Sequence, residues 1–346
     1  MTAKLISPLQ LALRQIASGE SLSGEEAGAA FDAVMAGDGT AAQLGALLMG
    51  LRVKGETPDE LAGAARALRN AMTELKTSRP SELVDTCGTG GGAMTTFNIS
   101  TAAAILAAGA GVRVAKHGNR SFTTRSGSAD VLEALGVAID VPVDHMGEVL
   151  DRAGIVFMFA PTMHPAMRHV GPARREMAIE TLMNLVGPLA NPAGAGRQVI
   201  GVASPSRLEI IAGALQRLGT THSLVVHGEP GMDEISPIGL TTVIELRGHE
   251  ITRWMLDPAA YGFAGMKAGE LAGGEPADNA ALIKRVLAGG GPPAAEAAVL
   301  LNAAGAIYVS GKAPTYAAAV ETARATLRSG KGTAALAALR KAAPHS

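Results

Sequence analysis

The chain has 346 residues and a formal net charge of -1 at pH 7, and 47% of its residues are hydrophobic although only 3% are aromatic. The near balance of charge argues against a broad surface for nucleic acid or anionic membranes. The apolar residues are mostly Ala, Leu, Val and Ile, which favours helices packed on a sheet over a β-sandwich. The length suits two compact units, or one large unit with an appendage.

Only one cysteine, Cys87, is present, so a disulfide within the chain is excluded and a reducing compartment is expected. The first residues contain no signal-like apolar block. The longest apolar stretches are shorter than the ~20 residues that span a bilayer. We therefore expect a soluble cytoplasmic protein.

Helical signals fill residues 8–76. Apolar residues recur at helical spacing, and Ser23 followed by Glu26 is a capping signal. No strand-like alternation appears before "KTSRPSE" at 76–82, which resembles a linker. We predict a small all-α domain over residues 1–78.

From residue 83 onward, β-branched runs alternate with Ala-rich helices, a pattern typical of a parallel or mixed sheet with helices on both faces. Residues 165–190 interrupt the alternation with a helix and two Pro/Gly-rich turns, and we expect them to return and pack on the helical unit. The large α/β domain would comprise residues 79–164 and 191–346. The expected strands lie in 83–88, 111–118, 137–142, 155–161, 198–204, 222–229 and 241–256.

"DTCGTGGGAMTTFNIST" at 85–101 places glycines between an expected strand and an expected helix. Glycines allow a loop to expose successive N–H groups, and a helix start adds a positive dipole. Together they can bind a phosphate. The run matches neither the Walker pattern nor the dinucleotide fingerprint. A strand-to-helix turn without a ligand remains the alternative.

"KHGNRSFTTRSGSAD" at 116–130 gathers Lys116, Arg120 and Arg125 beside hydroxyls and amides at the start of another expected helix. This pattern indicates a second anion site. The alternative is a solvated basic loop followed by an ordinary helix cap.

Two further clusters carry charge. Asp233 and Glu234 follow a strand and would suit Mg²⁺ next to a phosphate site, although adjacent surface acids are the simpler alternative. "HPAMRHVGPARRE" at 164–176 concentrates His and Arg, and an arginine there offers a planar fork for a carboxylate. The alternative is a solvated helix face.

No Ser-His-Asp or Cys-His set is evident, so we expect positioning and charge stabilisation, not covalent catalysis.

These segments, with "FAPTMHPAM", "NLVGPLANPA" and "HGEPGMDEIS", closely resemble the anthranilate phosphoribosyltransferase family up to about residue 310. The resemblance implies a small all-α domain and a large α/β domain whose central, mostly parallel sheet is flanked by helices, with the active site at the hinge. It also implies a homodimer that pairs through the helical domains, and Mg²⁺ as cofactor. The substrates would be anthranilate and phosphoribosyl pyrophosphate.

The resemblance also implies roles for individual residues. Lys116, Asn119 and Arg174 would be catalytic, with Arg174 facing the anthranilate carboxylate. Ser100, Asp233 and Glu234 would hold magnesium. The residues that would contact the substrates are Gly88, Gly91, Gly92, Thr96, Asn98, Ile99, Ser100, Thr101, Lys116, His117, Gly118, Asn119, Arg120, Ser121, Thr124, Ser128, Arg174 and Pro188.

The sequence departs from the family pattern in two places. The family's loop usually reads Gly-Thr-Gly-Gly-Asp-Gly, whereas Gly92 and Ala93 occupy the last two positions here. The family usually has Gly-Ile-Arg-Thr where this chain has Ala178 to Thr181, so Glu180 replaces a cation that we expect near the anthranilate end. We expect the first departure to alter magnesium dependence and the second to alter acceptor binding, unless Glu180 forms a structural ion pair.

Two other functions remain to be distinguished. A pyrimidine-nucleoside phosphorylase would share the architecture and bind free phosphate and a nucleoside. A non-catalytic relative would bind sugar phosphates or nucleic acid. The paired sites for a diphosphate and an aromatic acid argue against the first, and the near-zero net charge with an intact "KHGN" argues against the second.

Overall fold

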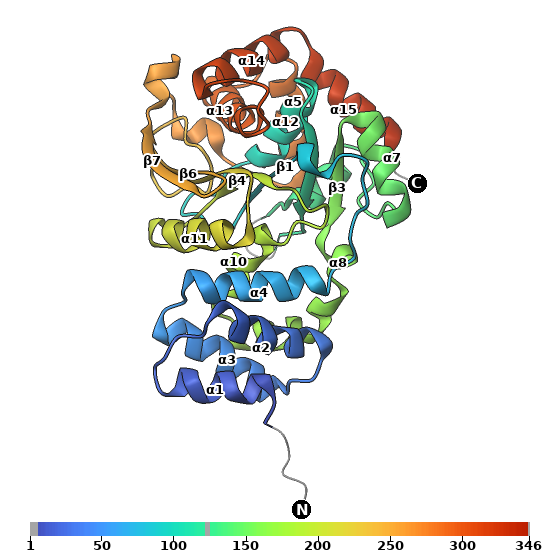
Figure 1. Ribbon diagram of the computed structural model, residues 1–346. Coiled ribbons are helices and arrows are strands. Elements are labelled where there is room, and N and C mark those ends of the chain that lie inside the picture. The colour runs from blue at the N-terminus through green and yellow to red at the C-terminus, as the bar shows by residue number, and fades with distance from the viewer. Residues whose placement is uncertain (1–5, 122–124, 345–346) are drawn as a thin grey trace, which may run out of the picture.

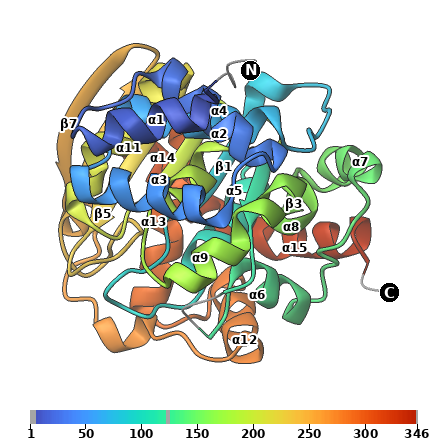
Figure 2. The same cartoon turned by 90° about the horizontal axis from the view of Figure 1, so that it is seen from below.

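The computed structural model describes residues 6–121 and 125–344. A layer of helices forms its lower part in Figure 1 and lies in front in Figure 2. Each helix begins after a hydroxyl side chain that accepts a hydrogen bond from the third helical N–H, and the Glu or Gln at that third position bonds back, which closes a capping box. The helices are α1 (Pro8–Ala17), α2 (Gly24–Ala36), α3 (Ala41–Lys54) and α4 (Pro58–Asn70).

Above this layer, the described residues form a seven-stranded sheet of order β3-β2-β1-β4-β5-β6-β7. The first five strands of the chain are parallel, and β6 pairs antiparallel with both β5 and β7, so the mostly parallel sheet is confirmed. The strands are β1 (Leu83–Gly88), β2 (Arg113–Gly118), β3 (Ile155–Phe159), β4 (Arg197–Gly201), β5 (His222–Gly228), β6 (Thr241–Arg247) and β7 (Glu250–Leu256).

The expected strand at 137–142 is wrong. Val137 makes only an isolated bridge to Pro344, and the Ala138 N–H donates to the Ala343 carbonyl at 3.0 Å. A strand needs a neighbouring strand with which to exchange backbone hydrogen bonds, and this segment meets the end of a helix instead.

The long run at 241–256 forms two strands, because the chain turns at Gly248, whose φ is 56°.

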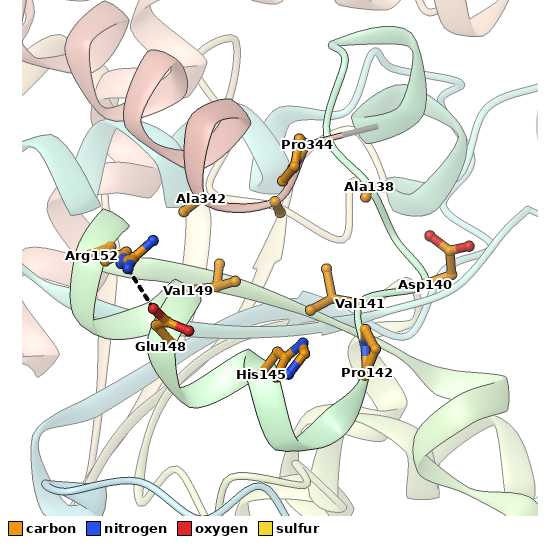
Figure 3. A pocket seen from close by; sticks show the side chains of 11 residues that line it. Ala138, Asp140, Val141, Pro142, His145, Glu148, Val149, Arg152, Ala342 and Pro344 are labelled. Carbon is orange, nitrogen blue, oxygen red and sulfur yellow. Dashed lines mark ion pairs between the residues drawn. The ribbon is translucent and has the colours of Figure 1, made fainter. Parts of the chain in front are cut away.

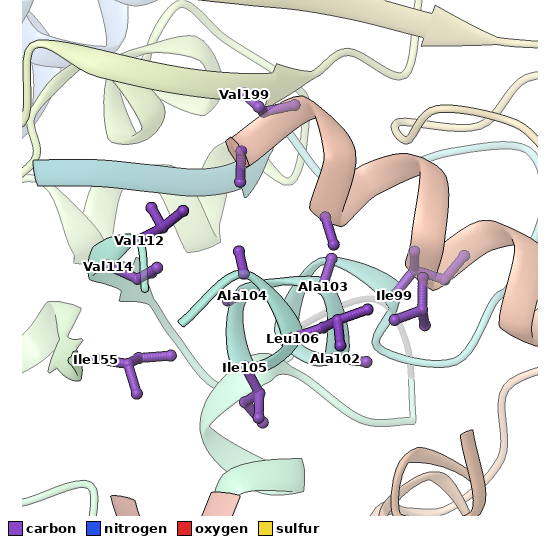
Figure 4. Close-up of a cluster of buried hydrophobic side chains, with 14 of the residues drawn as sticks. Ile99, Ala102, Ala103, Ala104, Ile105, Leu106, Val112, Val114, Ile155 and Val199 are labelled. Atoms are coloured by element: carbon purple, nitrogen blue, oxygen red, sulfur yellow. The ribbon is translucent and has the colours of Figure 1, made fainter. Parts of the chain in front are cut away.

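Helices cover both faces of the sheet, and alternate side chains of each strand serve the two faces. Val199 of β4 points to the upper core and Ile200 to the lower one. In the upper core α5 (Ile99–Gly109) is buried along most of its length, and Figure 4 shows its alanines and Ile105 among Val112, Val114, Ile155 and Val199. Besides α1 to α5, the helices of at least seven residues among the described residues are α6 (Ser128–Ala134), α7 (Val143–Ala153), α9 (Gly171–Met177), α11 (Leu208–Leu218), α12 (Pro276–Leu287), α13 (Pro293–Val309), α14 (Tyr316–Arg328) and α15 (Lys331–Ala342).

The lower core joins the helical layer to the underside of the sheet. Leu47 of α3, Leu182 of the returning segment and Val225 of β5 belong to the same buried cluster. Helix α11 packs on α4, and the Arg217 Nε atom lies 2.6 Å from the Asp59 Oδ1 atom across that contact. Residues 165–190 contact α2, α3 and α4 through short helical turns and α9.

None of the helices in the described residues is long and apolar enough to cross a membrane.

Candidate active site

Four parallel strands end at one edge of the sheet, and many of the predicted site residues lie at or just beyond these ends. Gly88 ends β1, Gly118 ends β2, Gly201 ends β4 and Gly228 ends β5. After β1 the chain forms β2 on one side of β1, and it later forms β4 on the other side of β1. Such a reversal of strand order is the point at which open α/β sheets bind ligands.

The loop after β5 lies so close to the ends of β1 and β4 that side chains do not fit between them. A Cβ on Gly201 would lie 1.7 Å from the backbone oxygen of Asp233, and a Cβ on Gly88 would lie 2.6 Å from the Asp233 Oδ2 atom. The Gly90 N–H donates to this same Oδ2 at 2.9 Å. The glycines therefore allow the Asp233 carboxylate to reach the backbone of residues 88–92, which we call the glycine loop.

The next two glycines complete the loop. Gly91 has a φ of 78°, a left-handed conformation that favours glycine. A Cβ on Gly92 would lie 3.1 Å from the Asp233 Oδ1 atom. The predicted positions Gly88 and Gly92 thus lie against the Asp233 side chain, and Gly91 belongs to the same loop.

The three predicted metal residues also come together. The Ser100 N–H, at the start of α5, donates to the Glu234 Oε1 atom at 3.1 Å. The Lys116 ammonium lies 3.3 Å from the Ser100 hydroxyl and donates to the Thr86 carbonyl. Each carboxylate of the Asp233–Glu234 pair thus accepts a hydrogen bond from a backbone N–H to which an anionic ligand would otherwise bind.

Burial shifts the pKa values of these groups. It raises the pKa of Asp233, and burial together with the nearby Asp233 charge raises the pKa of Glu234 to about 8. Burial also lowers the pKa of Lys116. Two neighbouring half-buried carboxylates repel each other, and a divalent cation between them would relieve that repulsion. Mg²⁺ commonly takes one or two protein carboxylates and fills its shell with water and phosphate oxygens, so these residues fit it.

A pair of buried histidines lies at the end of β2. The His117 Nε2 and His164 Nε2 atoms are 3.1 Å apart, and the rings meet edge to face. Burial lowers the pKa of His117 to about 3 and that of His164 to about 4, so both rings are neutral at pH 7. His164 therefore adds no positive charge to its segment, contrary to the sequence-based interpretation. The predicted Pro188 is buried, and its carbonyl accepts from Gln198 Nε2 at 2.8 Å.

The loop after β2 is held mainly by its own helix, α6. Arg120 is exposed and forms ion pairs with Asp130 and Glu133 at 2.8 and 2.6 Å. The Asp130 Oδ2 atom also accepts from the N–H of Ser121 at 3.2 Å. The Ser128 hydroxyl donates to the Asn119 carbonyl at 3.2 Å. Arg120 is thus turned to carboxylates of the protein, and its role toward a substrate stays a prediction. Thr124 lies outside the described residues.

The second half of the glycine-rich run is pinned to neighbouring loops. The Asn98 side chain bonds to Ser126 and accepts from Asn279 Nδ2 at 2.9 Å. Thr96 forms a bridge to Ala272. The other two predicted residues of this stretch are Ile99, whose side chain is fully buried in the core, and Thr101, whose buried hydroxyl has no hydrogen-bond partner among the described residues.

Arg174 lies on α9 in the returning segment. Its Nη2 atom donates to the Asn184 Oδ1 atom at 3.2 Å, and the Thr181 N–H donates to the same oxygen at 3.2 Å. Burial lowers the pKa of Arg174 from its usual value, without removing its charge at pH 7. Asn184 thereby fixes both the predicted acceptor-binding arginine and the turn that follows α9.

Glu180 lies against the glycine loop. Its Oε1 atom is 3.5 Å from the position of a Cβ on Gly91. It forms no ion pair among the residues that the structure describes. The structural ion pair considered from the sequence is therefore absent from this part of the chain.

Sequence reasoning missed Asp85, a fully buried carboxylate on β1. It accepts from the His117 N–H at 3.2 Å and from Asn191 Nδ2 at 2.7 Å, so it ties β1 to β2 and to the end of the returning segment. Burial raises the pKa of Asp85, and the nearby Lys116 opposes this. The signal in the sequence was a charged residue inside the expected strand that leads into the glycine loop.

A separate cavity of about 270 Å³ lies between α7 and the C-terminal part of the chain. Figure 3 shows Val141, His145, Val149 and Arg152 along its wall, with Arg152 paired to Glu148. None of the predicted site residues lines it.

Known proteins resemble both parts of the chain. Residues 80–333 match the α/β domain of a glycosyl transferase family, and residues 10–72 match the helical bundle domain of a glycosyl transferase family. The anthranilate phosphoribosyltransferase of Pelotomaculum thermopropionicum is 47% identical over 325 residues, which cover 94% of each chain.

Solved structures agree with this relationship. The anthranilate phosphoribosyltransferase of Thermus thermophilus superposes with a TM-score of 0.89 at 43% identity, covering 95% of this chain and 99% of that one. The Saccharomyces cerevisiae enzyme in complex with PRPP and Mg gives 0.85 at 26% identity and covers 97% of both chains. Its complex with 4-fluoroanthranilate gives 0.85 at 25% identity, covering 98% and 99%.

The fold, the loops at the strand ends and near-complete matches to these relatives lead to one conclusion: this chain belongs to the anthranilate phosphoribosyltransferase family of glycosyl transferases.

Proposed function

We propose that this protein transfers the phosphoribosyl group of phosphoribosyl pyrophosphate to the amine of anthranilate, a step of tryptophan biosynthesis. The products are N-(5-phosphoribosyl)anthranilate and pyrophosphate. The observation that carries the proposal is the meeting of the glycine loop, the start of α5, Lys116 and the Asp233–Glu234 pair at one edge of the sheet. The yeast complexes with PRPP and Mg and with 4-fluoroanthranilate support the choice of substrates.

Backbone donors would bind the diphosphate. The N–H groups of Gly90 and Ser100 now face carboxylates, and they would face phosphate oxygens when those carboxylates turn to a cation. Mg²⁺ held by Ser100, Asp233 and Glu234 would stabilise the negative charge that develops on the leaving group. The Lys116 ammonium would add a fixed positive charge beside Ser100, where the pyrophosphate charge grows.

Residues of the returning segment and of β2 would hold the acceptor. Arg174 would bind the anthranilate carboxylate through its planar fork. Asn119 would orient the acceptor, and His117 and Pro188 would line its site. Because both members of the buried histidine pair are neutral, this wall carries no charge at pH 7 and suits an aromatic ring.

At the anomeric carbon, the reaction forms one bond and breaks one. The anthranilate nitrogen forms a bond to the anomeric carbon while the bond from that carbon to the pyrophosphate oxygen breaks, with inversion. The nitrogen then loses one proton to water. An aryl amine is already neutral at pH 7, so the protein's main tasks are alignment of the two substrates and stabilisation of the departing charge.

We also propose a homodimer that pairs through the helical domains. Leu11 of α1 and Met49 and Val53 of α3 are 53%, 45% and 74% exposed, and these two helices pack side by side. Exposed apolar side chains on neighbouring helices are typical of a protein–protein contact.

In the same proposal, residues 1–78 with 165–190 form one domain, residues 79–164 with 191–346 form the other, and the site lies at their hinge. A cytoplasmic location would fit a chain whose single cysteine is a free thiol.

Anthranilate fluorescence tests the activity. We expect it to decline when the protein, phosphoribosyl pyrophosphate and Mg²⁺ are all present, and to stay constant when any one is omitted. Unchanged fluorescence with folded protein and all ligands would overturn the proposal. A parallel incubation with uridine and phosphate tests nucleoside phosphorolysis, and we expect no release of uracil.

A further inference from the structure

The glycine loop meets carboxylates from two different parts of the chain. Asp233 approaches from the loop after β5, with its Oδ1 atom 3.1 Å from the Cβ position of Gly92. Glu180 approaches from the returning segment, with its Oε1 atom 3.5 Å from the Cβ position of Gly91. Consecutive glycines of the proposed diphosphate site therefore lie beside acids that are 53 residues apart in sequence.

The backbone holds Glu180 at this place. Ala178 ends α9 with a φ of 51°, so the chain reverses sharply two residues before Glu180. Thr181, the next residue, is buried, and its N–H donates to Asn184. The Glu180 side chain itself is exposed and has no salt-bridge or hydrogen-bond partner among residues 6–121 and 125–344. Its carboxylate is thus free to bind a ligand of the site.

Charge decides which ligand it would bind. Asp233 and Glu180 each lie against the glycine loop that we assign to the diphosphate, and Glu234 accepts from the Ser100 N–H, whereas Lys116 is the buried cation beside Ser100. A carboxylate at the edge of this site would repel a bare diphosphate, and it would attract a divalent cation bound to that diphosphate.

We propose that Glu180 is an additional acid for the divalent cation that accompanies the substrate's diphosphate, contributed by the returning segment; this inference rests on the proposed function. It is a positioning residue as well. Asn184 accepts hydrogen bonds from both Thr181 and Arg174, so a cation that fixes Glu180 also fixes the turn that orients Arg174. Occupation of the diphosphate site thereby prepares the site for the acceptor.

The proposed role of Glu180 in cation binding is tested by calorimetry. Phosphoribosyl pyrophosphate is titrated into the protein without anthranilate, at a series of Mg²⁺ concentrations. Ionic strength is kept constant, because salt screens exposed charges. We expect Glu180→Gln to need about 3–10-fold more Mg²⁺ than the parent for half-maximal binding, as one partly screened carboxylate–cation contact predicts. Glu180→Asp should lie between the two. Glu176→Gln, an exposed acid on α9, is the matched control and should equal the parent.

An unchanged Mg²⁺ midpoint for Glu180→Gln would overturn the inference. A lower midpoint would overturn it too, because it would mean that Glu180 acts only by repelling the diphosphate. The proposed coupling of Glu180 to Arg174 predicts that the anthranilate KM of Glu180→Gln is raised at low Mg²⁺ and approaches the parental value at high Mg²⁺. A KM raised equally at all Mg²⁺ concentrations would refute the coupling to Arg174.

The same titrations separate this inference from the proposed function. If the parent binds no phosphoribosyl pyrophosphate at any Mg²⁺ concentration, the proposed function fails. If the parent binds it and Glu180→Gln behaves identically, only the role of Glu180 fails.

Discussion

Gly201→Ala is the sharpest test of the contact between β4 and the loop that carries Asp233. The new Cβ would lie 1.7 Å from the Asp233 carbonyl oxygen and 2.4 Å from its carbonyl carbon, whereas real Cβ contacts essentially never fall below 3.0 Å. The oxygen must therefore move by about 1.3 Å, since the neighbouring atoms are backbone and not the end of a flexible side chain. Overpacking of this kind costs about 1–3 kcal/mol of folding stability.

The catalytic effect should exceed the effect on stability. A displacement of about 1 Å in a residue that aligns reacting groups can lower the rate about 100-fold. We expect kcat/KM to fall by this order, with a raised Mg²⁺ requirement because the Asp233 carboxylate leaves the glycine loop. The assay is anthranilate fluorescence decay across a Mg²⁺ series, with urea unfolding to measure the loss of stability.

Gly45→Ala supplies the control for exchanging glycine for alanine. Gly45 lies in α3, and a Cβ there meets no atom within 4 Å, so we expect parental activity and a gain of about 0.5–1 kcal/mol in stability. If Gly201→Ala kept the parental kcat/KM and Mg²⁺ midpoint, the close contact with Asp233 would have no part in the activity, and the reasoning would be refuted.

Three further changes test other parts of the structure. Ala178→Gly should raise the free energy of unfolding by about 0.5–1 kcal/mol in urea titrations, because alanine is strained at a φ of 51°; an equal or lower value would contradict this. Burial raises the pKa of Glu245, but hydrogen bonds to four side chains outweigh it and bring the pKa down to about 2; these are led by His222 and include the single tryptophan, Trp254. The contribution of Glu245 to stability is therefore complete above about pH 5 and is lost as the pH falls toward 2. Stability followed by Trp254 fluorescence should accordingly depend less on pH in that range for Glu245→Gln, and equal slopes would argue against it. Gly92→Asp would place a second carboxylate beside Asp233 and should shift the Mg²⁺ titration of activity; a titration identical to the parent's would count against a role for this position.

Local patterns in the sequence were sufficient for much of the fold. Capping signals such as Ser23 with Glu26 act within a few residues, and the structure has these bonds. The alternation of strands and helices predicted a mostly parallel sheet, because a parallel pair needs a crossover connection. The segment at 137–142 failed for the opposite reason: its β-branched residues suit a strand, but no neighbouring strand edge is available to it.

The site was predictable as a set of loops but not in its contacts. Parallel strand ends bring Gly88, Lys116 and Asp233 to one edge, which strand order alone implies. That the Asp233 carboxylate occupies the glycine loop, and that Glu180 reaches the same loop, depends on where the returning segment and the loop after β5 finally pack. Such long-range packing leaves no short-range signal, and neither does the neutral state of the His117–His164 pair, which follows from burial.

The core shared by the helical layer and the lower face of the sheet has a consequence for biosynthesis. Leu47 and Leu61 are buried among side chains as distant in the chain as Leu182, Val225 and Leu246. The first four helices pack largely on one another, but the surface that α4 turns to α11, and that α2 and α3 turn to the returning segment, has no partner when these helices emerge. That surface stays open until about two thirds of the polypeptide has been made. We expect a ribosome-bound fragment that stops before β4 to be more protease-sensitive at this surface than the full chain, and the nascent protein to need shielding from aggregation during that interval.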